Sequence, residues 1–270
     1  MQSRGALSIK VSVVISTYNR PDYLTRVIEG YLSQTRLPDE IIIADDGSRD
    51  DTAAMVAALR AAANVPIVHV WHEDRGFRAA RIRNKAVARS SGQYIILCDD
   101  DCIPAAALVE DHLRYSRQGC FIQGHRVLLG AGISDSFSLE DRSLLRLLDL
   151  ARKGQANNIK NALRLPLPLV RISQSLRGIR SCNMSFYRND FIAVNGFNED
   201  FEGWGKEDSE LAVRLYKYGL KRKDLKFRAC CYHLFHPYYD RDNLERNIGL
   251  LEKAQAASGY FCSNGVDKYL

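Results

Sequence analysis

The sequence predicts an α/β fold, with one mostly parallel sheet flanked by helices and a less regular part toward the C-terminus. Three observations predict it. Short β-branched runs alternate with helix-like segments through the first half of the chain, polar clusters follow three of those runs, and the alternation stops in the second half. With 270 residues, of which 46% are hydrophobic, the chain can bury a sizeable core.

The first half is predicted to contain four strands, with a helix after each of the first three. Apolar, β-branched runs of this length are typical of buried parallel strands. Pro21 stands near the start of the first helix, where its fixed backbone angle is favourable. The expected strands cover residues 9–16, 40–45, 66–71 and 93–98, and the expected helices cover 21–34, 51–63 and 79–90.

The polar clusters after the strands predict where a ligand binds. They are Ser16-Thr17-Tyr18-Asn19, Asp45-Asp46-Gly47-Ser48 and Asp99-Asp100-Asp101. Parallel strands bring their carboxyl ends to one edge of the sheet, and ligands of such sheets bind beyond that edge. We therefore expect one binding site that uses all three clusters.

The second half is predicted to contain an amphipathic helix over 138–151 and a strand over Leu225–Cys231. Residues 152–180 are rich in Leu, Lys and Arg, and Pro166 and Pro168 prevent a regular helix there. We expect an insertion or mobile loop in this segment. Its basic, leucine-rich character suits contact with a membrane surface, and an ordinary packed loop is the alternative.

Charge and cysteine content restrict the class of protein. The net charge of +6 suits a phosphate-bearing substrate, an anionic membrane or nucleic acid. No nucleic-acid-binding motif is present, so we expect no nucleic-acid partner. The seven cysteines form no CxxC pair, which favours reduced thiols over disulfides or a zinc site.

Membrane and export signals are also missing from the pattern. No apolar run approaches the roughly 20 residues that a membrane helix needs. The opening MQSRGALSIK lacks the apolar segment of a secretory signal. We expect a cytoplasmic protein, with peripheral contact at the cytoplasmic membrane face as an open alternative.

Asp99-Asp100-Asp101 predicts a metal site. A D-x-D at a strand end aims two carboxylates at one point, and hard divalent cations take oxygen ligands. Three adjacent aspartates repel one another, so a purely structural role explains them poorly. A histidine in the later stretch YHLFHP, either His233 or His236, would add a nitrogen ligand that suits manganese as well as magnesium.

The stretch GWGKED predicts a mobile loop beside a reactive carboxylate. Glycines flank Trp204, and Glu207 and Asp208 then open an amphipathic helix. Either acid is placed to take a proton from an acceptor hydroxyl, and Trp204 is placed to lie against a sugar face. Acids in a first helical turn also suit the helix dipole, and this alternative stays open.

Together, these motifs resemble the inverting GT-A glycosyltransferases of family 2. VSVVISTYNRPDYL and EIIIADDGSRDDT are similar to the family's N-terminal half. GFRAARIRN, DDDCIP, NGFNEDFEGWGKED and YHLFHP are similar to the subset related to β-1,4-galactosyltransferases and bacterial chondroitin-type synthases. The resemblance covers residues 9–130 and 178–240, and it implies a GT-A fold.

The resemblance also implies residue roles. Asp46 matches a carboxylate that accepts a hydrogen bond from uracil, and Asp208 matches the general base. Trp204, Gly205 and Glu207 match acceptor-binding positions. The expected metal ligands are Asp99, Asp101 and one of His233 and His236. The expected donor-binding residues are Ser16, Thr17, Tyr18, Arg20, Asp45, Asp46, Phe77, Arg81, Asp99 and Asp100.

Two departures from the family pattern stand out. Lys206 occupies the place of a second loop glycine, and the middle residue of the D-x-D, Asp100, is itself acidic. The first change affects the motion of the loop or adds a contact to an anionic acceptor. The second leaves open which pair of acids binds the metal.

The implied function is sugar transfer from a nucleotide diphosphate donor, UDP-linked, with Mn²⁺ or Mg²⁺. The acceptor would be a saccharide or glycolipid of bacterial surface polysaccharide or lipopolysaccharide assembly. A catalytically degenerate sugar- or nucleotide-binding module and a nucleotidyltransferase are the alternatives. We expect one continuous domain with a nucleotide-sugar half (1–130), an insertion (131–177), an acceptor and catalytic half (178–240) and a C-terminal helix and tail (241–270).

Overall fold

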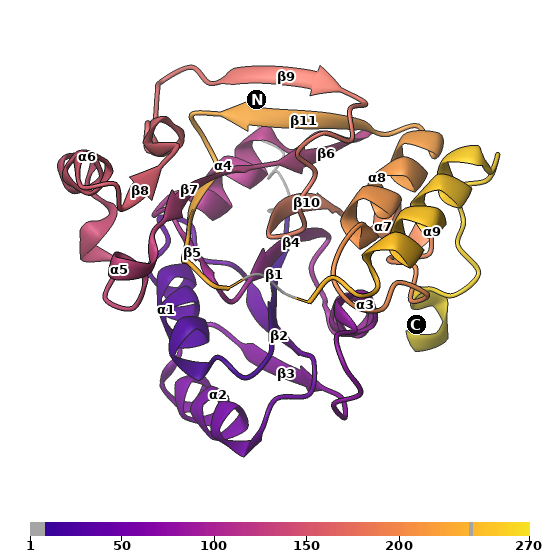
Figure 1. Cartoon of the computed structure of the whole chain (residues 1–270), viewed down its shortest axis with the longest axis horizontal. Helices are drawn as coiled ribbons and strands as arrows, with labels where there is room; N and C mark the ends of the chain where they lie inside the picture. Colours follow the sequence, from indigo (N-terminus) through magenta and orange to yellow (C-terminus); the bar gives the residue numbers. More distant parts are fainter. Residues whose placement is uncertain (1–8, 238–239) are drawn as a thin grey trace, which may run out of the picture.

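The computed structural model describes residues 9–237 and 240–270. It contains an eight-stranded mixed sheet with helices on both faces, and beside it a smaller four-stranded sheet (Figure 1). The large sheet has the strand order β3-β2-β1-β4-β10-β6-β11-β9. Its strands are β1 (Val11–Thr17), β2 (Glu40–Asp45), β3 (Ile67–Trp71), β4 (Tyr94–Asp99), β6 (Cys120–Gln123), β9 (Leu169–Ser173), β10 (Asn183–Tyr187) and β11 (Lys221–Lys226).

The first half of the chain has the predicted alternation. Strands β1 to β4 are mutually parallel, and α1 (Pro21–Leu32), α2 (Asp50–Ala62) and α3 (Ala79–Arg89) connect them. Thr17 pairs with Asp45, and Ser16 pairs with Asp99. This register places the three polar clusters at one edge of the sheet, as expected.

The other half of the large sheet is mixed. β10 is antiparallel to both of its neighbours, β4 and β6, whereas β11 is parallel to β6 and antiparallel to β9. The remaining helices are α4 (Leu108–Tyr115), α5 (Ala131–Ser134), α6 (Leu144–Arg152), α7 (Arg188–Ala193), α8 (Glu207–Lys217) and α9 (Leu244–Ala256), with short 3₁₀ turns at Glu140–Arg142, Ile159–Ala162 and Val266–Tyr269. α9 and the final turn lie within residues 241–270, the segment predicted as a C-terminal helix and tail.

The smaller sheet was not predicted. It consists of β5 (Cys102–Pro104), β12 (Cys230–His233), β7 (His125–Leu129) and β8 (Ala156–Asn157), in that order. β12 pairs with β5 so that His233 lies opposite Cys102, and the Leu234 amide donates to the Asp101 carbonyl at 2.8 Å. This pairing joins two stretches that are far apart in sequence, YHLFHP and DDDCIP.

The prediction of a single strand over Leu225–Cys231 is wrong, because two strands share this segment. Phe227 and Ala229 both have positive φ, at 66° and 47°. The chain therefore turns between them, and β11 in the large sheet and β12 in the small one replace one continuous strand.

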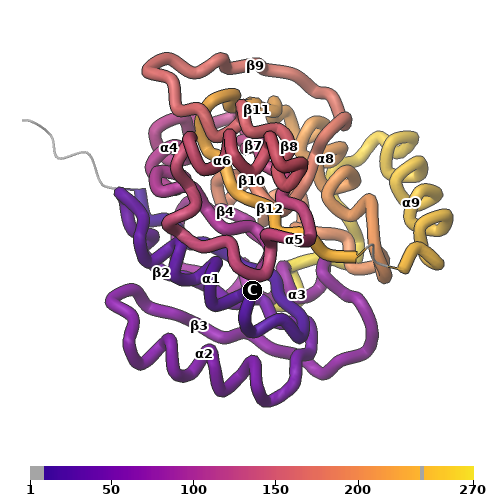
Figure 2. The backbone as a smooth tube through the Cα atoms, turned by 60° about the vertical axis from the view of Figure 1, so that its left-hand side comes forward, coloured from indigo at the N-terminus to yellow at the C-terminus, as the bar shows by residue number. Residues whose placement is uncertain are grey.

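The segment 152–180 is also more regular than expected. The predicted helix over 138–151 forms only as a 3₁₀ turn and α6, because Ser143 caps α6 by accepting a hydrogen bond from the Arg146 amide. After Pro166 and Pro168 the chain forms β9, an edge strand paired with β11, in place of an irregular loop. Figure 2 shows α6 and β9 on the outside of the molecule.

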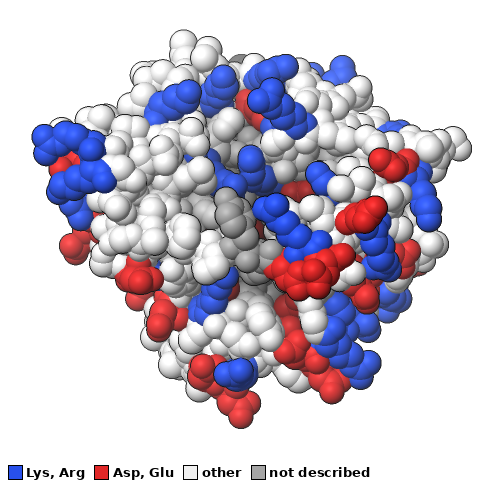
Figure 3. All heavy atoms as spheres, viewed as in Figure 1, with Lys and Arg blue, Asp and Glu red and all other residues white. Residues whose placement is uncertain are grey.

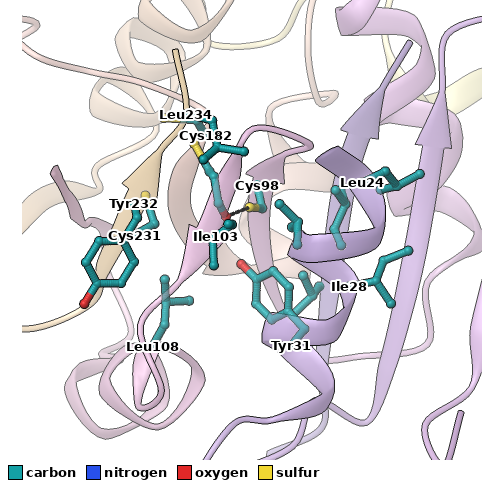
Figure 4. Packing of buried hydrophobic residues seen from close by; sticks show 14 of the residues in the cluster. Leu24, Ile28, Tyr31, Cys98, Ile103, Leu108, Cys182, Cys231, Tyr232 and Leu234 are labelled. Carbon is teal, nitrogen blue, oxygen red and sulfur yellow. Dashed lines mark hydrogen bonds between the residues drawn. The ribbon is translucent and has the colours of Figure 1, made fainter. Parts of the chain in front are cut away.

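Side chains alternate between two buried clusters, one on each face of the large sheet. In β2, Ile41 and Ile43 face the cluster under α1 and α2, while Ile42 faces the cluster under α3, α7 and α8. Figure 4 shows the first cluster, where Tyr31 of α1 packs near Cys98. All seven cysteines are buried and unpaired, in agreement with the expected thiols.

Among the described residues, no helix is both long and apolar enough to cross a bilayer. The sequence expectation about a leader concerns residues 1–10, of which 1–8 lie outside the described residues.

Candidate active site

A cleft of about 850 Å³ lies beyond the carboxyl ends of the parallel strands. Basic side chains border the hollow near the middle of the face in Figure 3. Most of the predicted site residues line the cleft. They are Ser16, Thr17, Tyr18, Arg20, Asp46, Phe77, Asp99, Asp100, Asp101, Trp204, Gly205, Glu207, Asp208, His233 and His236.

Hydroxyl groups at the end of β1 hold two of the three aspartates. Ser16 Oγ donates to Asp99 Oδ1 at 2.7 Å, and Thr17 Oγ1 donates to Asp100 Oδ2 at 2.7 Å. Burial and the neighbouring Asp101 charge raise the pKa of Asp100 to about 8. The middle acid is thus held by a hydroxyl, in a setting that disfavours its charged form.

Asp101 faces both candidate histidines. His233 Nε2 lies 3.7 Å from Asp101 Oδ1, and His236 Nε2 lies 3.4 Å from Asp101 Oδ2. One ligand atom from each of the three lies within 4.8 Å of the other two. Burial lowers the pKa of His233, so its imidazole is kept in the neutral form that binds metal. A carboxylate with two imidazoles fits Mn²⁺ and other divalent ions that accept oxygen and nitrogen ligands.

Asp99 lies outside this group of three. Its Oδ1 accepts hydrogen bonds from Ser16 and from Arg83 Nη2, the latter at 2.8 Å. Although burial opposes the shift, the Arg83 charge lowers the pKa of Asp99. The outer acids of the D-x-D therefore have different surroundings, Asp99 with an arginine and Asp101 with two histidines.

Arg83 was missed by the sequence analysis. Its guanidinium is buried and bridges Asp99 and Glu207, with Nη1 3.1 Å from Glu207 Oε1. The segment GFRAARIRN indicated the right helix, but the arginine proposed from it was Arg81. Residues two apart on a helix point in different directions, so only one of the two can face the cleft.

Arg81, predicted as a donor contact, does not line the cleft, and its Nε lies 3.8 Å from Glu199. The same holds for Asp45, which is fully buried and bonded to His69 and to the Ser48 amide at 2.8 and 2.7 Å. Burial opposes the shift, but these hydrogen bonds lower the pKa of Asp45. Asp45 therefore stabilises the loop after β2 without lining the cleft.

Asp46 does line the cleft and is held in place from two sides. His72 Nε2 lies 2.6 Å from its Oδ1, and the Arg78 amide donates to its Oδ2 at 2.7 Å. Tyr18 is 44% exposed at the rim and donates its hydroxyl proton to Asp74 at 2.7 Å. The loops after β1, β2 and β3 are thus tied together around this part of the cleft.

The Trp204 loop has an unusual backbone. Gly203, Gly205 and Lys206 all have positive φ, at 71°, 106° and 77°. The Gly203 amide donates to the Phe77 carbonyl at 2.9 Å, which joins this loop to the one before α3. The Arg241 guanidinium lies over the Trp204 ring at 5.2 Å, and the indole remains 36% exposed.

Glu207 and Asp208 begin α8 and also line the cleft. Glu207 is paired with Arg83, whereas Asp208 Oδ1 accepts from the Ser209 amide at 2.6 Å and from its hydroxyl at 3.1 Å. Burial and the Glu207 charge raise the pKa of Asp208 to about 7. A carboxylate with this pKa can accept a proton near neutral pH, the property a general base needs.

Two family models together match most of the chain. The model described as glycosyl transferase family 2 matches residues 12–163, and the model described as the N-terminal domain of galactosyltransferase matches residues 162–237. The first covers more than half of the chain.

Among curated proteins, validoxylamine A glucosyltransferase of Streptomyces hygroscopicus subsp. limoneus is 30% identical over 225 residues, which are 78% of this chain and 48% of the relative. Hyaluronan synthase of Pasteurella multocida is 26% identical over 78% of this chain and 23% of the relative. Chondroitin synthase of Escherichia coli is 24% identical, over 83% and 34%. The chain thus spans about half the length, or less, of these relatives.

Solved structures share the fold at low sequence identity. S. aureus TarS 1–349 in complex with UDP has a TM-score of 0.65 at 14% identity and covers 91% of this chain and 65% of that one. A mannosyltransferase from Pyrobaculum calidifontis, in complex with GDP-Man and Mn²⁺, has a TM-score of 0.59 at 17% identity and covers 84% and 57%. The fold is therefore the expected GT-A fold, and the chain belongs to glycosyl transferase family 2.

Proposed function

We propose that this chain is a metal-dependent, inverting glycosyltransferase that moves a sugar from a UDP-linked donor to a hydroxyl of a saccharide or glycolipid. One observation carries the proposal. A single cleft is lined by the close group of Asp101, His233 and His236 and also by Asp208. Those are the groups needed for a departing diphosphate and for an attacking hydroxyl.

The donor would bind across residues 1–130, over the ends of the parallel strands. Asp46, held by His72 and the Arg78 amide, would accept a hydrogen bond from the base, and Phe77 would stack beside it. Ser16, Thr17, Tyr18 and Arg20 would line the nucleotide. UDP is supported by the likeness to a structure solved with UDP, while another similar structure contains GDP-Man.

Asp101, His233 and His236 would hold Mn²⁺ or Mg²⁺. A divalent ion bound there would neutralise the diphosphate as it leaves. Asp99, anchored by Ser16 and Arg83, would face the ribose or the ion.

Asp208 would act as the general base. Its raised pKa lets it take the proton of an acceptor hydroxyl as that oxygen attacks the anomeric carbon from the side opposite the diphosphate, which inverts the configuration. Glu207 is paired with Arg83 and would orient the acceptor, while Trp204 would cover the sugar and exclude water.

The test compares two aspartates that have the same local contact. Asp208→Asn should lower kcat by about 10²-fold or more while UDP affinity with Mn²⁺ is retained. Asp51→Asn is the matched control, because Asp51 also accepts from the next residue's amide, at 2.7 Å, but is exposed at the start of α2. Near-normal turnover by Asp208→Asn would refute the general-base role. If the wild-type protein does not bind UDP, a catalytically degenerate binding module is favoured.

We further propose that a lipid-linked acceptor of surface polysaccharide assembly is met at the cytoplasmic membrane face. Leu145 and Leu167 are 81% and 84% exposed on α6 and before β9, and Arg171 lies on the same edge strand. Apolar side chains among basic ones suit an anionic membrane surface. Leu167→Asp should reduce sedimentation with anionic liposomes at low salt, and Phe261→Asp, at another exposed site, should not.

A further inference from the structure

A second, smaller pocket of about 140 Å³ adjoins the main cleft. Arg126, Gly178, Arg180 and Cys182 line both. Ligand sites usually measure about 300 to 1,000 Å³, a range that includes the cleft but not this pocket. The pocket therefore has room for one substituent of a molecule bound in the cleft.

The pocket is strongly basic. Its lining includes Arg126, Arg180 and Arg222, and no acidic side chain. Arg222 already has a counter-charge, because its Nε donates to Asp224 at 2.9 Å and its Nη1 donates to two backbone carbonyls. Two arginine charges remain to be accounted for.

Neither Arg126 nor Arg180 forms an ion pair within 4.0 Å in the described part of the chain. Arg126 Nη1 lies 3.8 Å from Cys182 Sγ, and Arg180 Nη1 lies 3.5 Å from the Gly178 carbonyl. Burial, followed by the charge of Arg126, lowers the pKa of Arg180. Asp101 and Asp208 favour the charged forms of Arg126 and Arg180, but only from beyond 4.0 Å. Two neighbouring cations repel each other unless an anion lies between them.

The pocket wall is otherwise well ordered by hydrogen bonds. Gln123 Oε1 accepts from the Arg180 amide at 3.0 Å, and Gln123 Nε2 donates to the Asn183 carbonyl at 2.9 Å. One polar atom of the wall, His125 Nε2, is buried without a hydrogen-bond partner among residues 9–237 and 240–270. An anionic ligand oxygen in the pocket would give this nitrogen a hydrogen-bond partner and the two arginines an ion-pair partner.

The position of the pocket indicates which substrate it serves. Arg180 lines the pocket and also the cleft, and Asp208, the proposed base, lines the same cleft. The Asp208 carboxylate favours the charged form of Arg180. The donor diphosphate would instead lie at Asp101 and the two histidines. We propose, on the basis of the proposed function, that the acceptor carries an anionic group, a carboxylate or a phosphate, which Arg126 and Arg180 bind in this pocket.

The test measures binding and needs no turnover. Protein saturated with UDP and Mn²⁺ is titrated with glucose, glucuronate and glucose 6-phosphate, where the two anions separate a carboxylate pocket from a phosphate pocket. At least one anion should bind about tenfold or more tightly than glucose, as expected for hydrogen bonds to a charged group. Arg180→Gln should remove most of that preference, and Arg180→Lys should retain part of it. Arg117→Gln, an exposed arginine that lines neither cavity, should leave it unchanged.

Two results would overturn the inference while leaving the proposed function intact. One is equal binding of the three sugars, or no binding of either anion. The other is an Arg180→Gln protein that loses UDP affinity as strongly as anion affinity, because the arginines would then serve the donor diphosphate. A separate titration measures UDP binding. Failure of UDP to bind would overturn both the proposed function and this inference.

Discussion

Asp51 and Asp208 stand at the same position of their helices and accept the same hydrogen bond from the next amide. Their surroundings differ, because Asp51 is exposed and Asp208 lines the cleft next to Glu207. At the residue scale, this difference converts an ordinary helix-start acid into one with a pKa of about 7. A buried carboxylate with a raised pKa lowers stability whenever it is ionised.

Stability should therefore depend on pH through Asp208. Its folded-state pKa lies above the unfolded value of 3.8, so the cost is absent below about pH 4 and complete above about pH 7. The change that Asp208→Asn makes in the free energy of unfolding should be more stabilising at pH 8 than at pH 4, by roughly 1–3 kcal/mol. Urea unfolding at both pH values measures this, with Asp51→Asn as control. A difference that does not change with pH would contradict the shifted pKa.

Arg83 is the second residue whose environment decides its role. It is a buried cation between Asp99 and Glu207, and removing it leaves two acids without their partner. Arg83→Met should lower the free energy of unfolding by about 2–4 kcal/mol. Arg89→Met, at the exposed end of the same helix, should cost less than about 1 kcal/mol. Equal losses in the two variants would show that the bridge contributes little.

At the scale of elements, the Trp204 loop has a backbone suited to glycine. Gly203 has φ of 71°, and a Cβ there would lie 2.7 Å from Asn243 Nδ2 at the start of α9. Lys206 has φ of 77° but is not a glycine, and it directly precedes α8. A left-handed conformation costs a residue with a Cβ about 1–2 kcal/mol.

Lys206→Gly should therefore stabilise the protein by about 0.5–1 kcal/mol, the conformational relief less the entropy that glycine loses on folding. Lys206→Ala keeps the Cβ and should show no such gain. Thermal unfolding of both variants separates the backbone effect from loss of the lysine charge. Stabilisation by alanine as large as that by glycine would attribute the effect to charge.

The small sheet is the element that brings the proposed metal ligands together. β12 pairs with β5, and this pairing carries His233 and His236 to Asp101. Only residues 227–229, with positive φ at Phe227 and Ala229, separate β12 from β11 in the large sheet. The positive φ values of that connection therefore matter for the site as well as for the fold.

At the scale of the whole molecule, donor and metal should stabilise the folded state together. UDP with Mn²⁺, at one hundred times its Kd, should add about 2.7 kcal/mol to the free energy of unfolding, or several degrees in Tm. GDP, CDP and dTDP, each with and without Mn²⁺, are the comparison set. Asp101→Asn should lose the part that depends on metal. A shift by UDP that is the same without metal would contradict the proposed ligand group.

How far the sequence predicts the molecule differs between its two halves. The parallel strands and their helices follow from local patterns, and the ends of those strands correctly located the cleft. Lys206 and Asp100 were visible as departures from the family pattern, but their consequences were not. β9 and the small sheet lack such local signals, because pairing with a distant strand decides them.

The sequence by itself determined the family, the α/β class and the set of acids and histidines to which we assign the chemistry, because strand and helix periodicities and short motifs are local. Only the tertiary structure decided which of them meet. The tertiary structure places Arg83, and not Arg81, at the cleft, where Arg83 pairs with Glu207, 124 residues away. It also brings both histidines to Asp101. It further places Arg126 and Arg180 in one pocket wall, where neither has a carboxylate of the described residues within 4.0 Å. The direction of a side chain and the neighbours it meets depend on packing between distant segments, which no local pattern records.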